Sequence, residues 1–105
     1  MPLSSPGVAP EAVEDAVERM AQGPLYQVII HNDDLTPMDF VLHILTTIFD
    51  LAGPRAVQIM YTAHYHGSAY VQSLPRPEAV RRIGLAHTAA RLNHYPLKFT
   101  MEAEK

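Results

Sequence analysis

Glycine and proline divide this chain into short segments, and that division constrains the fold more than any other feature of the sequence. The breaks fall at Gly23 and Pro24, at Gly53, at Gly67 and at Pro75. Proline lacks a backbone N–H and glycine adopts left-handed backbone easily, so both are typical of the ends of helices and strands. In a chain of 105 residues these segments have room for one domain with a single hydrophobic core.

The pattern of apolar residues between the breaks predicts an α+β fold. Residues 26–31 form a continuous run of β-branched and aromatic residues, which favours a buried strand. Residues 97–102 alternate apolar and polar side chains, which is typical of a half-buried strand. The resulting β-α-α-β-α-β order predicts a three-stranded antiparallel sheet covered on one face by three helices. In chain order we expect strand 26–31, helix 37–52, helix 54–65, strand 68–74, helix 77–92 and strand 97–102.

Individual residues predict where these helices begin and end. Thr36 offers a hydroxyl for an N-cap, and Pro37 follows it at the first helical position. We expect Gly53 to stop the first helix in the left-handed conformation and Gly67 to stop the second. Gly84 lies inside the third helix, where glycine costs about 1 kcal/mol relative to alanine, so we expect a close packing contact or a weaker helix there.

The first part of the chain differs in composition from the rest. Residues 1–24 are expected to be a flexible extension, and residues 25–105 to be the folded domain. Within the extension, residues 11–21 place three apolar side chains at helical spacing among acidic ones. That is enough for a marginal helix that forms against a partner.

Composition excludes several classes of function. The chain has no cysteine, which excludes disulfides, thiol nucleophiles and zinc sites with thiolate ligands. A net charge of -3 argues against binding to nucleic acid, which needs a clustered excess of lysine and arginine. No run of about 18 apolar residues is present, nor a basic start followed by an apolar core. We therefore expect a soluble, cytoplasmic monomer with no cofactor and no nucleic-acid or membrane partner.

The most informative segment is an acceptor-rich turn joined directly to a helix start. Asn32, Asp33 and Asp34 together offer one amide and four carboxylate oxygens, a set suited to a cation with several hydrogens to donate, such as an ammonium. Asn and Asp are also ordinary turn residues, so a solvated turn is the alternative. The apolar residues Met38 and Val41 come next, at the start of the expected helix. The polar atoms of the turn and an apolar surface of the helix are therefore expected to lie side by side.

A histidine near the end of the second helix completes this candidate site. His64 lies on or beside the apolar stripe that contains Met60 and Ala63. Neutral imidazole accepts one hydrogen bond, so His64 placed opposite the turn would give a bound amine another acceptor. The apolar residues would enclose the side chain attached to that amine. The alternatives are a capping or packing role for His64 and a core position for Met38 and Met60.

Two other classes of protein stay open. His64-x-His66 with His31 or Asp33 predicts a metal site or a metal-dependent hydrolase. A structural interaction module, such as a ribosomal stalk-like α+β domain, has a similar topology. Nucleotide hydrolysis and the common acyl transfers lack support, because the sequence has no Gly-rich phosphate loop and no Gly-x-Ser-x-Gly.

Read as a string, the turn and the two helices have a recognisable form. Residues 26–45 are YQVIIHNDDLTPMDFVLHIL, residues 55–67 are RAVQIMYTAHYHG, and Pro96-Leu97 follows later. Over residues 26–102 the chain closely resembles the ClpS family, non-enzymatic adaptors that carry proteins with destabilising N-terminal residues to an AAA+ unfoldase of the Clp protease.

The resemblance implies roles for named residues. The free α-amino group of an N-degron substrate would be bound by Asn32, Asp33, Asp34 and His64. The first side chain, which in the family is Leu, Phe, Tyr or Trp, would enter a hydrophobic pocket. The pocket residues would be Thr36, Met38, Val41, Met60, Ala63 and Leu97.

Two departures from the family pattern bear on specificity and docking. The family commonly has valine where this chain has Ala63, which predicts more room for large aromatic side chains. The family contacts its unfoldase through an acid and a lysine, and here the matching positions hold Pro77, with Glu78 beside it, and Arg82. The partner would be a ClpA-like or ClpC-like unfoldase, which would also engage the N-terminal extension.

Overall fold

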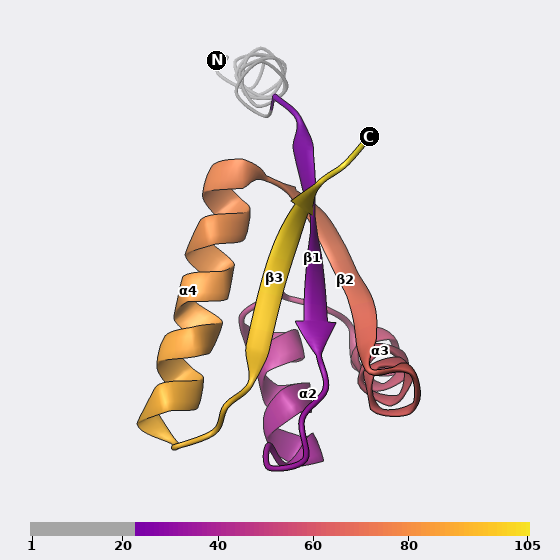
Figure 1. The fold of residues 1–105 in the computed structure, drawn as a ribbon, viewed down its shortest axis with the longest axis vertical. Coiled ribbons are helices and arrows are strands. Elements are labelled where there is room, and N and C mark those ends of the chain that lie inside the picture. Colours follow the sequence, from indigo (N-terminus) through magenta and orange to yellow (C-terminus); the bar gives the residue numbers. More distant parts are fainter. Residues whose placement is uncertain (1–22) are drawn as a thin grey trace, which may run out of the picture.

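The computed structural model describes residues 23–105, and within them the α+β prediction is confirmed (Figure 1). The expected flexible extension, including the marginal helix over residues 11–21, lies outside the described residues except for Gly23 and Pro24. In chain order the elements are β1 (Leu25–His31), α2 (Met38–Thr47), α3 (Gly53–His66), β2 (Ser68–Pro75), α4 (Arg76–Leu92) and β3 (Lys98–Ala103).

The three strands form one antiparallel sheet in the order β2-β1-β3, so β1 is central (Figure 1). Val28 and Ile30 of β1 are buried, and their alternation with less buried neighbours gives the strand one core-facing side. In antiparallel pairing a strand with one buried face needs helices on that face only. The core that joins the sheet to the helices consists mainly of Val28, Ile30, Ile44, Leu45, Phe49, Ile59, Val71 and Phe99.

The ends of α2 differ from the prediction. Thr36 does not cap the helix, because its hydroxyl donates to Asp33 Oδ2 at 2.8 Å, and Pro37 occupies the N-cap position instead. Gly53 does not stop α2 either: the helix ends at Thr47, Asp50 takes a positive φ of 56°, and Gly53 begins α3. Asp tolerates left-handed backbone because its short side chain bonds locally, so the chain reverses before it reaches the glycine.

The expected stop of α3 is confirmed, and of the two alternatives expected for Gly84 in α4 the close packing contact is excluded. Gly67 ends α3 with a φ of 91°, the conformation in which glycine avoids the steric cost of a Cβ. Gly84 of α4 makes no close packing contact with the described residues, since a Cβ built there meets none of their atoms within 4 Å. It therefore lies on an open face of α4, and the glycine only weakens the helix there.

Arg82 connects α4 to two other parts of the fold. Its guanidinium donates to the Phe49 carbonyl and to Gln72 Oε1, each at 3.2 Å, and to Glu78 Oε2 at 2.8 Å. Gln72 also donates to the Phe49 carbonyl at 3.2 Å. The side chain is only 20% exposed, so these bonds are better shielded from water than those of a surface pair. Arg82 thus holds the turn after α2, strand β2 and helix α4 together.

We expect Arg82→Met to lower the free energy of unfolding by about 1 to 2 kcal/mol, because it keeps most of the apolar stem and removes three hydrogen bonds. Arg81→Met is the matched control: Arg81 is 58% exposed and, among residues 23–105, pairs with Glu78 alone, so we expect a loss of less than about 0.5 kcal/mol. Urea denaturation measures both. Equal losses in the two variants would contradict a structural role for Arg82.

Candidate functional site

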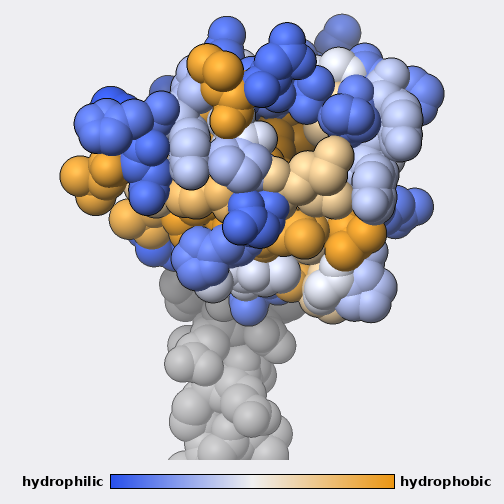
Figure 2. Space-filling model, turned by 90° about the horizontal axis from the view of Figure 1, so that it is seen from below, coloured by the Kyte–Doolittle hydropathy of each residue, from blue (hydrophilic) through white to orange (hydrophobic). Residues whose placement is uncertain are grey.

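The described part of the chain has a cavity of about 330 Å³ at the end of the molecule where β1 runs into α2. Its walls come from the end of β1, the loop over residues 32–37, the first turns of α2, the second half of α3 and the residue before β3. Figure 2 views this end, where apolar surface lies among polar side chains. The volume falls within the range of pockets that hold small ligands.

Asp33 gives the loop after β1 its shape. Its Oδ1 accepts hydrogen bonds from the backbone N–H groups of Leu35 and Thr36 at 2.8 and 2.7 Å, and its Oδ2 accepts one from the Thr36 hydroxyl. An aspartate that bonds the backbone two and three residues ahead closes a tight turn without a helix or strand partner. Because each carboxylate oxygen has two lone pairs, Oδ2 keeps acceptor capacity beyond this turn.

A backbone hydrogen bond fixes this loop next to the end of α3. The N–H of Asn32 donates to the carbonyl of Gly67 at 2.9 Å, immediately beyond the last turn of the helix. His64 lies in that last turn, and both Asn32 and His64 line the cavity. Asn32, Asp34 and His64 are all exposed, so their polar atoms are available at its mouth.

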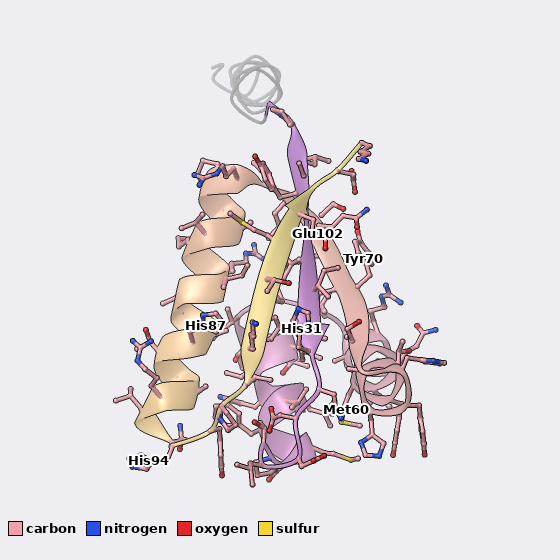
Figure 3. All side chains as sticks on the ribbon, in the orientation of Figure 1. His31, Met60, Tyr70, His87, His94 and Glu102 are labelled. Atoms are coloured by element: carbon pink, nitrogen blue, oxygen red, sulfur yellow. The ribbon has the colours of Figure 1, made fainter. Side chains whose placement is uncertain are left out.

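The interior of the cavity is apolar. Met60, Ala63 and Leu97 are buried, and they come from α3 and from the segment that leads into β3. Figure 3 shows Met60 below the end of the sheet, between α2 and α3. Met38 is 42% exposed in the first turn of α2, which places a flexible thioether at the rim. A ligand that fills this cavity would pass from polar atoms to an apolar floor.

All ten residues expected to bind an amine or a first side chain line this one cavity. They are Asn32, Asp33, Asp34, Thr36, Met38, Val41, Met60, Ala63, His64 and Leu97. Whether each of them contacts a ligand stays a prediction.

Four lining residues were missed: Ile30, His31, Leu35 and Pro37. The one feature of the sequence that could have pointed to these residues is their position next to the acceptor turn. His31 is also held in place by a side-chain hydrogen bond, with its Nε2 2.7 Å from the Thr100 hydroxyl.

The two residues expected to contact an unfoldase lie outside the cavity. Glu78 and Arg82 belong to the first turns of α4, whereas the cavity contains Leu97, which follows the other end of that helix. Hydrogen bonds from Arg81 and then Arg82 lower the pKa of Glu78 to about 2, so its carboxylate is charged at any physiological pH. Arg82 makes hydrogen bonds within the fold, so the Glu78–Arg81 ion pair is more exposed than the Glu78–Arg82 pair.

The metal alternative finds no support in residues 23–105. Within that range no group of three or more His, Asp or Glu side chains is placed to hold an ion, so His64, His66, His31 and Asp33 do not form a shared site. Helices that are both long and apolar enough to cross a bilayer are likewise missing from the described residues.

The cavity therefore combines two kinds of recognition. Uncharged and negatively charged acceptors from Asn32, Asp33, Asp34 and His64 surround the mouth, which suits a positively charged donor such as an ammonium. The buried thioether and aliphatic groups beyond it suit an apolar side chain. At the start of a polypeptide an ammonium group and a side chain are both bonded to the same carbon, the Cα.

Comparison with known proteins identifies the relatives of this chain. A family model described as "ATP-dependent Clp protease adaptor protein ClpS" matches residues 21–100. The chain is 35% identical over 104 residues to the ClpS adapter of Desulforapulum autotrophicum, covering 99% of this chain and 100% of that protein. It is 41% identical over 90 residues to the ClpS adapter of Edwardsiella ictaluri, covering 85% of each.

A solved structure agrees with these matches. Agrobacterium tumefaciens ClpS2 bound to L-phenylalaninamide superposes with a TM-score of 0.74 at 36% identity, covering 77% of this chain and 98% of that one. The family model spans most of the chain, and the fold agrees with the solved relative. The chain therefore belongs to the ClpS family of ATP-dependent Clp protease adaptors.

Proposed function

We propose that this protein binds the free α-amino group and the bulky apolar first side chain of N-degron substrates and delivers them to a Clp AAA+ unfoldase. The observation that carries the proposal is a cavity of about 330 Å³ with hydrogen-bond acceptors at its mouth and a buried apolar floor. Membership of the ClpS family supports the adaptor role. The ClpS2 relative supports the ligand class, because L-phenylalaninamide has a free amine beside a benzyl side chain.

In this proposal the ammonium donates to Asn32, Asp34 and His64, and to the lone pairs that Asp33 does not use within its own loop. Charge-assisted hydrogen bonds of this kind contribute about 1.5 to 3 kcal/mol each before ordering costs. Burial of the first side chain against Met60, Ala63 and Leu97 adds roughly 1.5 to 3 kcal/mol. Neither contribution suffices for tight binding alone, so the site selects for both groups together.

The shape of the pocket sets its preference among first residues. Leu, Phe, Tyr and Trp branch beyond Cβ and can pass the rim at Met38 before they widen. Val and Ile are wide at Cβ and stiff at χ1, so they meet the rim and bind less well. Ala63 contributes only a methyl group to the floor, which favours large aromatic side chains.

Delivery to the unfoldase requires a second surface, and we place it at the start of α4. There Glu78 is charged and one third exposed, and Arg81 is the more exposed of its two arginine partners. The partner is a ClpA-like or ClpC-like unfoldase, which also engages the N-terminal extension. This surface and the cavity lie toward opposite ends of α4, so the unfoldase and the ligand would contact different residues.

Titration of peptides that differ only in the first residue tests the proposal. A Leu-initiated peptide is expected to bind about tenfold to a hundredfold more tightly than its Ala-initiated twin, because three more carbon groups enter the pocket. A Leu→Ala change at the second position is the matched control and is expected to change the dissociation constant much less. Equal affinities for the two first residues would refute the proposal.

A further inference from the structure

His87 of α4 receives a hydrogen bond that the recognition site described above does not explain. The backbone N–H of Phe99 in β3 donates to His87 Nε2 at 3.0 Å. Figure 3 shows His87 on the side of α4 that faces β3. Since Nε2 accepts, the ring is neutral and its one proton is on Nδ1.

This bond and a second one hold the segment that carries the pocket residue Leu97. The N–H of Tyr95 donates to the carbonyl of Ala90 at 2.9 Å, and the N–H of Phe99 donates to His87. Both acceptors belong to α4, and Leu97 lies midway between the two donors. Helix α4 therefore holds the chain on both sides of Leu97, which is the pocket residue contributed by the segment before β3.

The position of β3 makes the bond to His87 more consequential. Within residues 23–105 the strand is at the edge of the sheet, so no described strand pairs with its outward N–H groups. Phe99 is buried and its ring stacks on Phe49 at 4.9 Å, so an unpaired N–H at this residue would be poorly hydrated. The neutral imidazole supplies the acceptor that a neighbouring strand would otherwise supply.

From this geometry we propose that His87 is a positioning residue for ligand binding: its neutral ring fixes Phe99, and through the adjoining backbone it fixes Leu97 in the pocket wall. Protonation of the ring replaces the acceptor with a second N–H that faces the Phe99 N–H. The contact between α4 and the start of β3 is then lost, while β3 stays paired with β1. The pocket thereby gains a proton-sensitive wall. The inference rests on the proposed function, because it names a residue that shapes the same site.

The surroundings of the ring favour the neutral form. Partial burial lowers the pKa of His87, and the positive charges of Arg91 on α4 and Lys98 on β3 lower it further. The hydrogen bond is therefore complete above the ordinary histidine pKa of about 6.5 and is lost as the pH falls through the lower value of the folded protein. The expected consequence is weaker ligand binding in acid.

Two variants of His87 test the proposal at about pH 7.5. His87→Gln places an amide oxygen near the position of Nε2 and keeps an acceptor that does not titrate. His87→Leu keeps the bulk and removes the acceptor. We expect a Leu-initiated peptide to bind His87→Leu about fivefold more weakly than the wild type, and His87→Gln to bind within about twofold of it. If both variants bind as the wild type does, the proposal is wrong.

Amide hydrogen exchange gives a readout that needs no ligand. Exchange at Phe99 is expected to be at least about fivefold faster in His87→Leu, while exchange at Val28 in the central strand changes less. Equal acceleration at both positions would show only a general loss of stability and would overturn the positioning role. If no peptide binds the wild type, the proposed function fails, and the exchange at Phe99 still decides whether His87 holds β3.

A pH series separates His87 from the other titratable groups of the site. Between about pH 7.5 and about pH 5 the wild type is expected to lose more affinity than His87→Gln. Contributions from the peptide amine and from the histidines at the cavity are the same in both proteins and cancel in the comparison. Parallel pH profiles for the two proteins would contradict a proton-sensitive wall.

Discussion

A Leu-initiated peptide with an acetylated α-amino group is expected to bind at least about a hundredfold more weakly than its free-amine twin. Acetylation removes the positive charge and most of the hydrogens that face the acceptors at the mouth of the cavity. Two lost charge-assisted hydrogen bonds at about 1.5 to 3 kcal/mol each give a factor of this size. Fluorescence polarisation or calorimetry with the full chain measures it.

Controls assign this loss to the named acceptors. A twin peptide acetylated only on an internal lysine is expected to bind like the unmodified peptide. Asn32→Ala and His64→Ala are each expected to weaken the free-amine peptide about tenfold and to leave the residual binding of the acetylated peptide nearly unchanged. If acetylation of the first residue had no effect, the cavity would not be an amine site.

The largest effect on stability is expected from Phe49→Ala, which should lower the free energy of unfolding by about 3 to 5 kcal/mol. Phe49 is 1% exposed in the turn after α2, and its ring stacks on Phe99 with centroids 4.9 Å apart. Removing it leaves a cavity between the turn after α2 and strand β3, in a core that cannot collapse fully.

Urea denaturation against a matched control measures this effect. Leu92→Ala truncates a side chain that is 77% exposed at the end of α4 and is expected to cost less than about 0.5 kcal/mol. The substitution leaves in place the backbone carbonyl of Phe49, which accepts hydrogen bonds from Gln72 and Arg82, so the loss is expected to report on the ring. A loss of about 1 kcal/mol or less would place the ring outside the main core.

Local pattern predicted the elements well and their ends less well. Period and residue type along a short window decide whether a segment forms a helix or a strand, so the six elements appear in the predicted order. Ends depend on a competition among nearby polar groups. Thr36 was expected to cap α2, but Asp33 takes its hydroxyl, and Asp50 reverses the chain before Gly53 can.

The same limit applies to the polar residues of the site. The sequence predicted that Asn32, Asp33 and Asp34 are a cluster of acceptors, since they are consecutive. It did not predict that the Asp33 carboxylate accepts three hydrogen bonds from Leu35 and Thr36 within the loop. Likewise, Arg82 was expected at a partner surface, and only the packed structure shows its bonds to Phe49 and Gln72.

By itself, the sequence determined the kinds of element, their order and the chemical character of each side chain, because these follow from neighbours along the chain. Only the tertiary structure decided that a turn after β1, a histidine at the end of α3 and Leu97 before β3 meet around one cavity. It likewise decided that His87 holds the last of these walls. Residues so far apart in the chain are brought together by burial of a shared core, and no local pattern records which of them become neighbours.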